Sequence, residues 1–446
     1  MLELFSSGLI SIWLEMAGVQ VKPTDVLDIL AWQSSPGLVL APDPNPSGSA
    51  IVQQYLKGLQ TLKLVTTPEQ TQNQGIWLQS GPILMANHQG TTPLPAASLT
   101  KIATSLAALT TLGPNHQFHT LVSTTGSLQN GVLQGDLIVT GGGDPLFVWE
   151  EAIALGNSLN QMGIKRITGN LIINGNFAMN FQRNPLIAGQ MLRQAINSAT
   201  WSRAISFQHS LMAKGTLKPQ VTIAGQVKLL AQDVAFFQNP QQTLLLRHRS
   251  LPLRQIIKEM NVFSNNEMAE MLADAVGGAY VVQSKAARLA RVPQSEIQLI
   301  NGSGLGQENR ISPRAACAML MAIQKEAFAH QLTVADFFPT AGFDNRGTLH
   351  SRHLPAATVM KTGTLRDVSA LAGVVPTRDR GLVWFAIINR GYTVPAFRTG
   401  QDQFLQTLVK QLQVAPAIPA SLTPHTATST LPQFGAANRN EMVYGG

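Results

Sequence analysis

A serine and a lysine stand three residues apart in the stretch Ser98, Leu99, Thr100, Lys101. At the start of a helix, this spacing would place the hydroxyl and the amine on one face and within hydrogen-bonding reach. A serine hydroxyl attacks a carbonyl only when a base takes its proton. A lysine can be that base where burial or nearby positive charge lowers its pKa. The pair is a candidate nucleophile and base, but an exposed lysine on a surface helix would show the same spacing.

A second candidate group consists of Lys361, Thr362, Gly363 and Thr364, in a stretch that reads as a strand. At the edge of a pocket, Lys361 would present a cation and Thr362 a hydroxyl to a substrate carboxylate. Gly363 would let the backbone approach the substrate closely. The alternative is a turn at the start of a strand that binds no ligand.

A third group, Ser264 with Asn266, precedes a helical pattern. It could supply a second hydroxyl for proton transfer and an amide that anchors the substrate. The alternative is purely structural, because Ser264 could cap the helix and Glu267 could complete a capping box.

The three groups occur in the order Ser-x-x-Lys, Ser-x-Asn, Lys-Thr-Gly, and in this order the chain resembles the active-site serine penicillin-recognising superfamily. Within it, the chain is most similar to the class C low-molecular-mass penicillin-binding proteins, the D-alanyl-D-alanine carboxypeptidase/endopeptidase family. The likeness covers about residues 50–412, although Asn301 stands where the family often has Asp. Four further stretches contribute to it: 94–98, 142–145, 301–305 and 347–349.

This resemblance implies an acyl-serine enzyme that acts on peptidoglycan stem peptides and is inhibited covalently by β-lactams. Ser98 would be the nucleophile and Lys101 its general base, and the backbone N–H groups of Ser98 and Thr364 would form the oxyanion hole. Ser264 and Asn266 would relay protons and contact the substrate. The substrate would be bound by Lys361, Thr362, Gly363 and Thr364. Carboxypeptidase and endopeptidase action share the D-Ala acyl donor and differ only in the leaving group, so both stay open.

Two other functions are compatible with the motifs. One is a β-lactamase or esterase on the same fold, although about 160 residues separate Lys101 from Ser264, whereas simple β-lactamases have only a few tens. The other is a non-catalytic scaffold that binds the cell wall. A decayed site would be expected to lose at least one of the motif residues, and all of them are present.

The periodicity of apolar residues predicts the elements that would position these groups. We expect strands at 75–80, 83–87, 120–125, 135–140, 169–174, 359–365, 368–376 and 382–389. We expect helices at 49–59, 98–112, 149–162, 256–261, 266–276, 313–329 and 401–412. The fold class is therefore α/β (α+β), and the resemblance implies a penicillin-binding-protein/β-lactamase-like transpeptidase body.

The local composition changes along the chain, which predicts one domain inserted into another. Residues 49–117 and 250–412 would form the split serine peptidase body, and 118–249 the inserted α+β domain. Residues 1–48 would be an N-terminal segment and linker. Residues 413–446 are rich in Ala, Pro, Thr, Ser and Asn, which predicts a disordered tail.

The composition excludes several kinds of protein. Hydrophobic residues make up 44% of the chain and charged residues 13%, which is typical of folded domains. The net charge is +8, but the basic residues are scattered, so we expect no nucleic-acid partner. The nine histidines form no metal-binding pattern, so we expect no metal and no cofactor. Cys317 is the only cysteine, which excludes an intrachain disulfide.

The N-terminus is unusual for an exported enzyme. Residues 1–18 are largely apolar, but Glu3 and Glu15 interrupt them and the first basic residue is Lys22. A signal peptide normally has positive charge before its apolar stretch. We expect a periplasmic or cell-envelope location with an atypical export signal, or else an ordinary apolar helix here. No transmembrane helix is expected.

Overall fold

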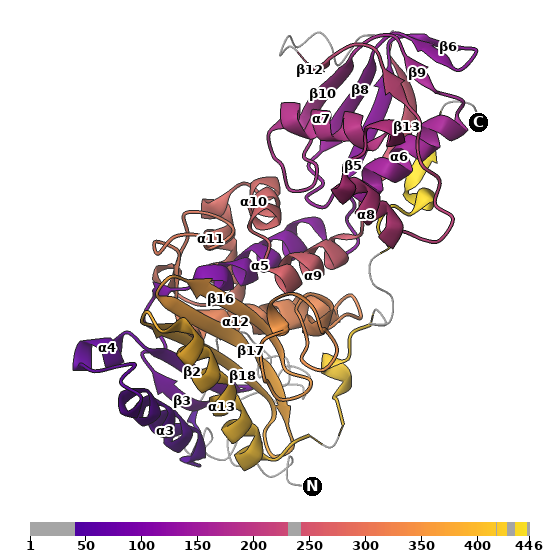
Figure 1. Ribbon diagram of the computed structural model, residues 1–446. Coiled ribbons are helices and arrows are strands. Elements are labelled where there is room, and N and C mark those ends of the chain that lie inside the picture. The colour runs from indigo at the N-terminus through magenta and orange to yellow at the C-terminus, as the bar shows by residue number, and fades with distance from the viewer. Residues whose placement is uncertain (1–40, 231–241, 416, 426–432, 444–446) are drawn as a thin grey trace, which may run out of the picture.

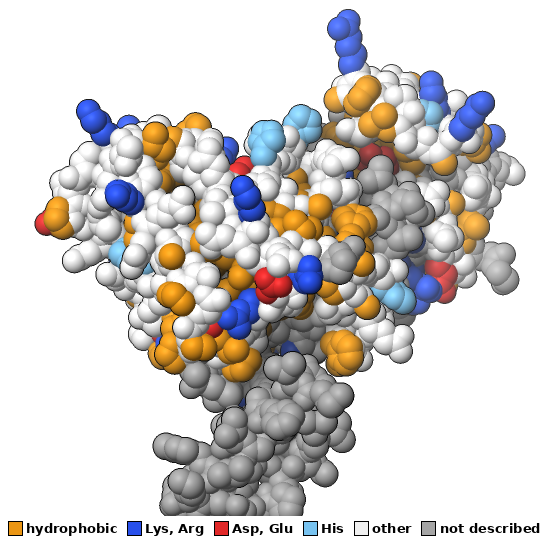
Figure 2. Space-filling model, turned by 90° about the horizontal axis from the view of Figure 1, so that it is seen from below, with side chains coloured by type: hydrophobic (Ala, Val, Ile, Leu, Met, Phe, Trp, Pro, Cys, Tyr) orange, Lys and Arg blue, Asp and Glu red, His pale blue; other side chains and the backbone are white. Residues whose placement is uncertain are grey.

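The computed structural model describes residues 41–230, 242–415, 417–425 and 433–443. The apolar stretch at 1–18 and its possible role in export lie outside the described residues. Within the described part of the chain, no helix has the length and apolar character needed to cross a membrane. On the face shown in Figure 2, the Lys and Arg side chains are dispersed and form no continuous stripe.

One half of the molecule, the lower part of Figure 1, is built on a six-stranded sheet with the order β1-β3-β2-β18-β17-β16. The pairs among β3, β2, β18, β17 and β16 are antiparallel. Because β16 ends the order, one of its edges stays unpaired in the sheet and is available to other groups. The strands are β1 (Ala41–Pro42), β2 (Gly75–Ser80), β3 (Ile83–His88), β16 (Val359–Leu365), β17 (Val368–Thr377) and β18 (Gly381–Arg390).

Helices cover both faces of this sheet. On one face, α3 (Ser47–Thr61) packs with α13 (Val394–Leu412). The other face carries α5 (Thr100–Leu112) and α12 (Pro313–Phe328). The buried residues of α3 are Gly48, Ile51, Val52, Tyr55 and Leu59, a pattern with helical spacing that places them on a single face of the helix.

Three further helices surround α5: α9 (Leu253–Phe263), α10 (Asn266–Ala275) and α11 (Ala279–Ala290). Every residue of α5 from Thr100 to Leu109 is buried, because α9, α10, α11 and α12 pack around this helix. Such a helix is a rigid support for side chains at its N-terminus.

The upper half in Figure 1 contains two sheets, with the orders β12-β10-β8-β5-β13-β19 and β11-β9-β7-β6. Helix α7 packs on β10 and β12, and α6 packs between α7 and α8. The larger sheet comprises β5 (His119–Thr124), β8 (Leu137–Gly142), β10 (Leu171–Asn176), β12 (Val227–Leu229), β13 (Thr243–Arg249) and β19 (Asn440–Met442). The smaller comprises β6 (Ser127–Gln129), β7 (Val132–Gln134), β9 (Arg166–Ile167) and β11 (Thr222–Ile223), and the helices are α6 (Trp149–Gln161), α7 (Pro185–Ala195) and α8 (Arg203–Leu211).

We propose that residues 118–249 are a domain inserted into the body, since the chain enters these sheets after α5 and returns to the body with α9. A hydrophobic cluster of their own, which includes Val122, Leu155, Leu171 and Leu245, supports this division.

The C-terminal tail is partly ordered. Strand β19 pairs antiparallel with β13, and a hydrogen bond of 2.7 Å joins His248 Nδ1 to Asn440 Oδ1. Arg439 donates to the buried carboxylate of Glu151. The prediction of disorder over 413–446 is therefore wrong for these residues. That prediction rested on the low apolar content of the segment, whereas ion pairs and a strand pairing hold these residues in place.

Candidate active site

Ser98 lies in the 3-10 helix η1 (Ala97–Leu99), immediately before α5. The preceding residue, Ala97, has a φ of 49°, in the left-handed region that is uncommon for a residue with a side chain. Residues 94–97 and 99–103 are buried, whereas Ser98 is only half-buried. The turn therefore directs the serine hydroxyl out of the core. Ser98 thus lies in a 3-10 turn before α5, and not in the α-helix that was expected to begin at residue 98.

Lys101, the second residue of α5, is completely buried. Its Nζ lies 3.0 Å from Ser98 Oγ, 2.8 Å from Asn266 Oδ1 and 2.7 Å from the carbonyl oxygen of Ser303. Burial lowers the pKa of Lys101 to about 7, against the opposing effect of the Glu270 carboxylate. A substantial fraction of this amine is therefore neutral at physiological pH.

The three contacts of Lys101 differ in what they can accept or donate. Asn266 Oδ1 and the Ser303 carbonyl are only acceptors, whereas the Ser98 hydroxyl can also donate. A neutral amine has two N–H donors and one lone pair. When both donors are directed at the two obligate acceptors, the lone pair is left for the Ser98 hydroxyl. The site is thus arranged for Lys101 to take a proton from Ser98.

Ser264 ends α9 in a left-handed conformation, with a φ of 54°. The next helix, α10, is capped by Asn265, whose side chain accepts from the backbone N–H of Met268 at 3.0 Å. The alternative in which Ser264 caps this helix together with Glu267 is therefore wrong. Because Asn265 does the capping, the Ser264 hydroxyl can accept from Lys361 Nζ, which lies 2.9 Å away.

Lys361 lies on β16 and is completely buried. Its Nζ donates to Ser264 Oγ and, at 2.8 Å, to the carbonyl oxygen of Thr362. Burial, and secondarily the charge of Lys101, holds the pKa of Lys361 well below its usual range. The structure thus brings all three sequence motifs together, with Ser98, Lys101 and Asn266 in one set of hydrogen bonds and Ser264 and Lys361 in the adjoining one.

Gly363 and Thr364 continue β16 past η1. An added Cβ on Gly363 would lie 2.8 Å from the carbonyl oxygen of Ala96, so only glycine lets the strand lie this close to the turn that carries Ser98. The N–H of Met360 donates to Pro339, away from β17. Since N–H directions alternate along a strand, the N–H groups of Thr362 and Thr364 also face the open edge.

Glu270 was not among the residues expected from the sequence. Its two carboxylate oxygens accept from the backbone N–H groups of Gly302 and Ser303, at 2.9 and 3.0 Å. It therefore fixes the loop whose Ser303 carbonyl contacts Lys101. Glu270 stands four residues after Asn266, on the same face of α10, and this spacing is the signal that could have identified it.

Asn301 shapes the same loop. Its Oδ1 accepts from the N–H of Gly304 at 2.8 Å, and its Nδ2 donates to the carbonyl of Leu305 at 2.7 Å. An ionised aspartate could only accept, so the amide found in this chain makes a contact that the acid common in the family would lack.

Replacing Glu270 by Gln is expected to move the acid limb of the acylation rate to lower pH. A lysine can act as a base only when it is neutral. The Glu270 carboxylate raises the pKa of Lys101, so removing this charge lowers that pKa. One charge-assisted hydrogen bond is also lost, which at roughly 1.5–3 kcal/mol should slow acylation about tenfold or more at alkaline pH. The measurement is the pH profile of β-lactam acylation by stopped-flow fluorescence.

The matched control for this variant is Glu267→Gln. Glu267 is exposed on the same helix, so its replacement removes the same charge without touching the loop. If both variants shifted the profile equally, or if Glu270→Gln left the acid limb in place, the role of Glu270 in positioning Lys101 would be refuted.

Known proteins share this sequence pattern. Residues 63–186 and 184–411 match the D-Ala-D-Ala carboxypeptidase 3 (S13) family. The chain is similar to the D-alanyl-D-alanine carboxypeptidase DacB of Haemophilus influenzae, with 26% identity over 400 residues, 70% of this chain and 83% of the relative. It is also similar to a carboxypeptidase of Mycobacterium tuberculosis, with 26% identity over 346 residues, 67% of this chain and 71% of the relative.

Solved structures with a similar fold include a predatory peptidoglycan endopeptidase from Bdellovibrio bacteriovorus. The TM-score is 0.64 at 21% identity, over 77% of this chain and 94% of that one. Penicillin-binding protein 4 of Haemophilus influenzae has a TM-score of 0.58 at 21% identity, over 81% of this chain and 99% of that one. These likenesses confirm the fold class expected from the sequence.

Proposed function

The chain belongs to the D-Ala-D-Ala carboxypeptidase 3 (S13) family, and we propose that Ser98 is the nucleophile with which it carries out the reaction of that family. The protein is a serine-type D-Ala-D-Ala carboxypeptidase or DD-endopeptidase. The observation that carries the assignment of Ser98 is its contact of 3.0 Å with Lys101, a buried amine whose pKa is about 7.

In the proposed acylation step, Lys101 takes the Ser98 proton while Ser98 Oγ attacks the carbonyl carbon of the penultimate D-Ala. The negative charge that forms on the carbonyl oxygen would be stabilised by the N–H groups of Ser98 and Thr364. The C–N bond then breaks, and the leaving amine needs a proton. Ser264, in contact with Lys361, and Lys101 itself are the groups in position to deliver it.

In deacylation, water takes the place that Ser98 has in acylation. Water attacks the carbonyl carbon of the ester that joins Ser98 to the D-Ala residue, and Lys101 accepts the proton from that water. The bond between this carbon and Ser98 Oγ then breaks, and Lys101 returns the proton to Ser98. Asn266, whose Oδ1 accepts from Lys101, keeps the amine beside the ester. The strand from Lys361 to Thr364 would hold the substrate in extended form along the open edge of β16, with Thr362 near the carboxylate of the leaving group.

The relatives that share the fold support two further parts of the proposal. One of the predatory endopeptidase structures is acylated by penicillin G, which supports covalent inhibition of this enzyme by β-lactams. The substrate, a cell-wall peptide, supports action in the cell envelope, and we propose the periplasm as its location.

The proposed function is tested with two purified muropeptides, a pentapeptide monomer and a cross-linked dimer. We expect the enzyme to release D-Ala from the first or to split the second, as measured by liquid chromatography with mass spectrometry. If a folded enzyme cleaved neither but hydrolysed benzylpenicillin rapidly, the β-lactamase alternative would replace the proposal. If it neither cleaved nor bound penicillin, the scaffold alternative would.

A further inference from the structure

Arg398, on the first turns of α13, reaches the end of the substrate-binding strand. Its Nη2 donates to Thr364 Oγ1 at 2.7 Å. In the described part of the chain, no carboxylate oxygen lies within 4.0 Å of its guanidinium. Of the other half-buried arginines of the body, Arg254 donates to the side-chain oxygen of Asn115. The rest are paired with carboxylates: Arg314, Arg346, Arg352, Arg380 and Arg390. An unpaired, partly buried cation beside a substrate-binding strand is a candidate partner for an anion of the substrate.

The side chains of β16 point alternately to its two faces. Met360 packs into the core beneath α13, whereas Val359 packs into the core beneath α12. By this alternation, the hydroxyls of Thr362 and Thr364 lie on the α13 face, the face from which Arg398 approaches. Lys361 points to the opposite face, where its ammonium is buried against Ser264. A carboxylate bound by the two threonines would therefore meet Arg398 directly.

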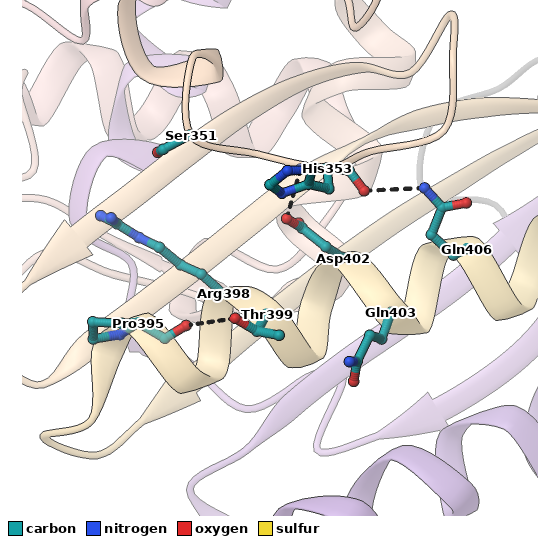
Figure 3. A pocket seen from close by; sticks show the side chains of 8 residues that line it. All are labelled: Ser351, His353, Pro395, Arg398, Thr399, Asp402, Gln403 and Gln406. Carbon is teal, nitrogen blue, oxygen red and sulfur yellow. Dashed lines mark hydrogen bonds between the residues drawn. The ribbon is translucent and has the colours of Figure 1, made fainter.

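Arg398 also lines a pocket of about 460 Å³ between α13 and the segment before β16. Figure 3 shows the guanidinium extending from α13 toward Ser351, with His353 and Asp402 further along the same hollow. Thr399, Gln403 and Gln406 complete the α13 side. The volume is within the range of pockets that hold small ligands or peptide segments.

The single acidic side chain that lines this pocket is already paired. Asp402 Oδ1 accepts from Arg352 at 2.7 and 2.9 Å, and Asp402 Oδ2 accepts from the backbone N–H of His353 at 2.9 Å. Arg352 is almost fully buried beneath it. The charge that the pocket offers to a ligand is therefore the positive charge of Arg398.

We propose that Arg398, Thr364 and this pocket form a subsite for the leaving group, in which Arg398 binds its carboxylate and the pocket receives the peptide beyond it. The inference rests on the proposed function and extends it. A departing D-Ala has a carboxylate but nothing more to place in the pocket. The leaving strand of a cross-linked dimer has both a carboxylate and further peptide, so the subsite favours DD-endopeptidase action.

The carboxylate contact is tested with two substrates of the same acyl donor, a pentapeptide with a free terminal carboxylate and a thioester whose leaving group is neutral. Arg398→Ala should raise KM for the pentapeptide about 10- to 100-fold and change kcat and the thioester reaction less than about threefold. Arg398→Lys should restore part of the loss. Arg378→Ala is the control, since it removes an exposed arginine outside the pocket.

The pocket is tested separately with Thr399→Trp, which fills it from an exposed position of α13. We expect cleavage of the cross-linked dimer to fall at least about tenfold while pentapeptide cleavage stays within about twofold. Gln411→Trp, exposed on the same helix but outside the pocket, should change neither.

The outcomes separate this inference from the proposed function. If the wild-type enzyme cleaved none of the substrates, the proposed function would fail. If it cleaved them but Arg398→Ala affected the pentapeptide and the thioester equally, or affected neither, the anion subsite would be refuted. Equal loss of monomer and dimer cleavage in Thr399→Trp would refute the pocket as the place of the extended leaving group.

Discussion

Replacing Ser98 by Ala is expected to abolish the covalent adduct that the wild-type enzyme forms with benzylpenicillin. In the proposed mechanism the acyl group bonds to Ser98 Oγ, which lies 3.0 Å from Lys101 Nζ, and alanine has no oxygen at this position. Removal of a serine nucleophile typically lowers turnover by at least about 10⁴-fold. The adduct is measured by mass spectrometry of the intact protein, followed by mapping of the labelled peptide.

Ser98→Ala should unfold at nearly the wild-type temperature. Ser98 is half-buried, and alanine fits the same turn without a new contact. This makes loss of the adduct attributable to chemistry rather than to folding. Ser206→Ala, at an exposed serine of α8, should label normally. An adduct on the Ser98→Ala variant, or an adduct on another peptide of the wild type, would refute the assignment of the nucleophile.

The motif residues could be found from the sequence because each needs a specific side chain at a specific spacing. Ser98 and Lys101 are close in sequence, and Lys361 to Thr364 form a continuous stretch of strand. What the sequence did not reveal was the backbone at Ser264. Serine and the following Asn265 are both good helix caps, and the left-handed conformation that ends α9 is usually found at glycine or asparagine. The choice between them depends on how α9 and α10 pack.

Arg398 was missed for a different reason. The last helix was expected to begin near Gln401, but α13 begins at Val394 with Pro395 in its first turn. Proline is well suited to that position, since its missing N–H would have no partner there. The proline at position 395 is therefore the sequence signal that could have placed Arg398 on a helix. Its contact with Thr364 joins residues 34 positions apart and follows only from the way α13 packs on the sheet.

Glu270 and the C-terminal tail show the same limit. A carboxylate that accepts two backbone N–H bonds, and a strand that pairs with another almost 200 residues earlier in the chain, leave little trace in local periodicity. Hydrophobic patterning predicts which elements form. It does not predict the polar contacts that join them, such as those of the Glu270 carboxylate, whose charge raises the pKa of Lys101 against the effect of burial.

The second large effect is expected for Lys101→Met. Methionine is close to lysine in length and fills the buried space, but it has no lone pair that could take the Ser98 proton. Loss of a general base typically slows a reaction by roughly 10²–10⁴-fold. Wild-type acylation should rise with pH and reach half its plateau near pH 7, the pKa of Lys101, whereas the residual rate of the variant should lack this limb.

Stability provides an independent check on the same lysine. Burial lowers the pKa of Lys101 in the folded protein to about 7 from an ordinary value of 10.5, so between these values the unfolded chain binds more protons. Stability therefore rises with pH across this window, and the full penalty for the buried charge applies below it. The free energy of unfolding, measured by urea titration, should thus be larger for Lys101→Met relative to wild type at pH 6 than at pH 10, because the substitution removes the penalty that the wild type bears at pH 6.

These two readouts separate the possible roles of Lys101. A variant that acylates within about tenfold of the wild-type rate would show that Lys101 is not the base, and would point instead to Lys361 acting through Ser264. Slow acylation with no pH dependence in the stability difference would mean that Lys101 takes part in catalysis but keeps an ordinary pKa. Only slow acylation together with the expected pH dependence fits a buried amine that is neutral when it meets the Ser98 hydroxyl.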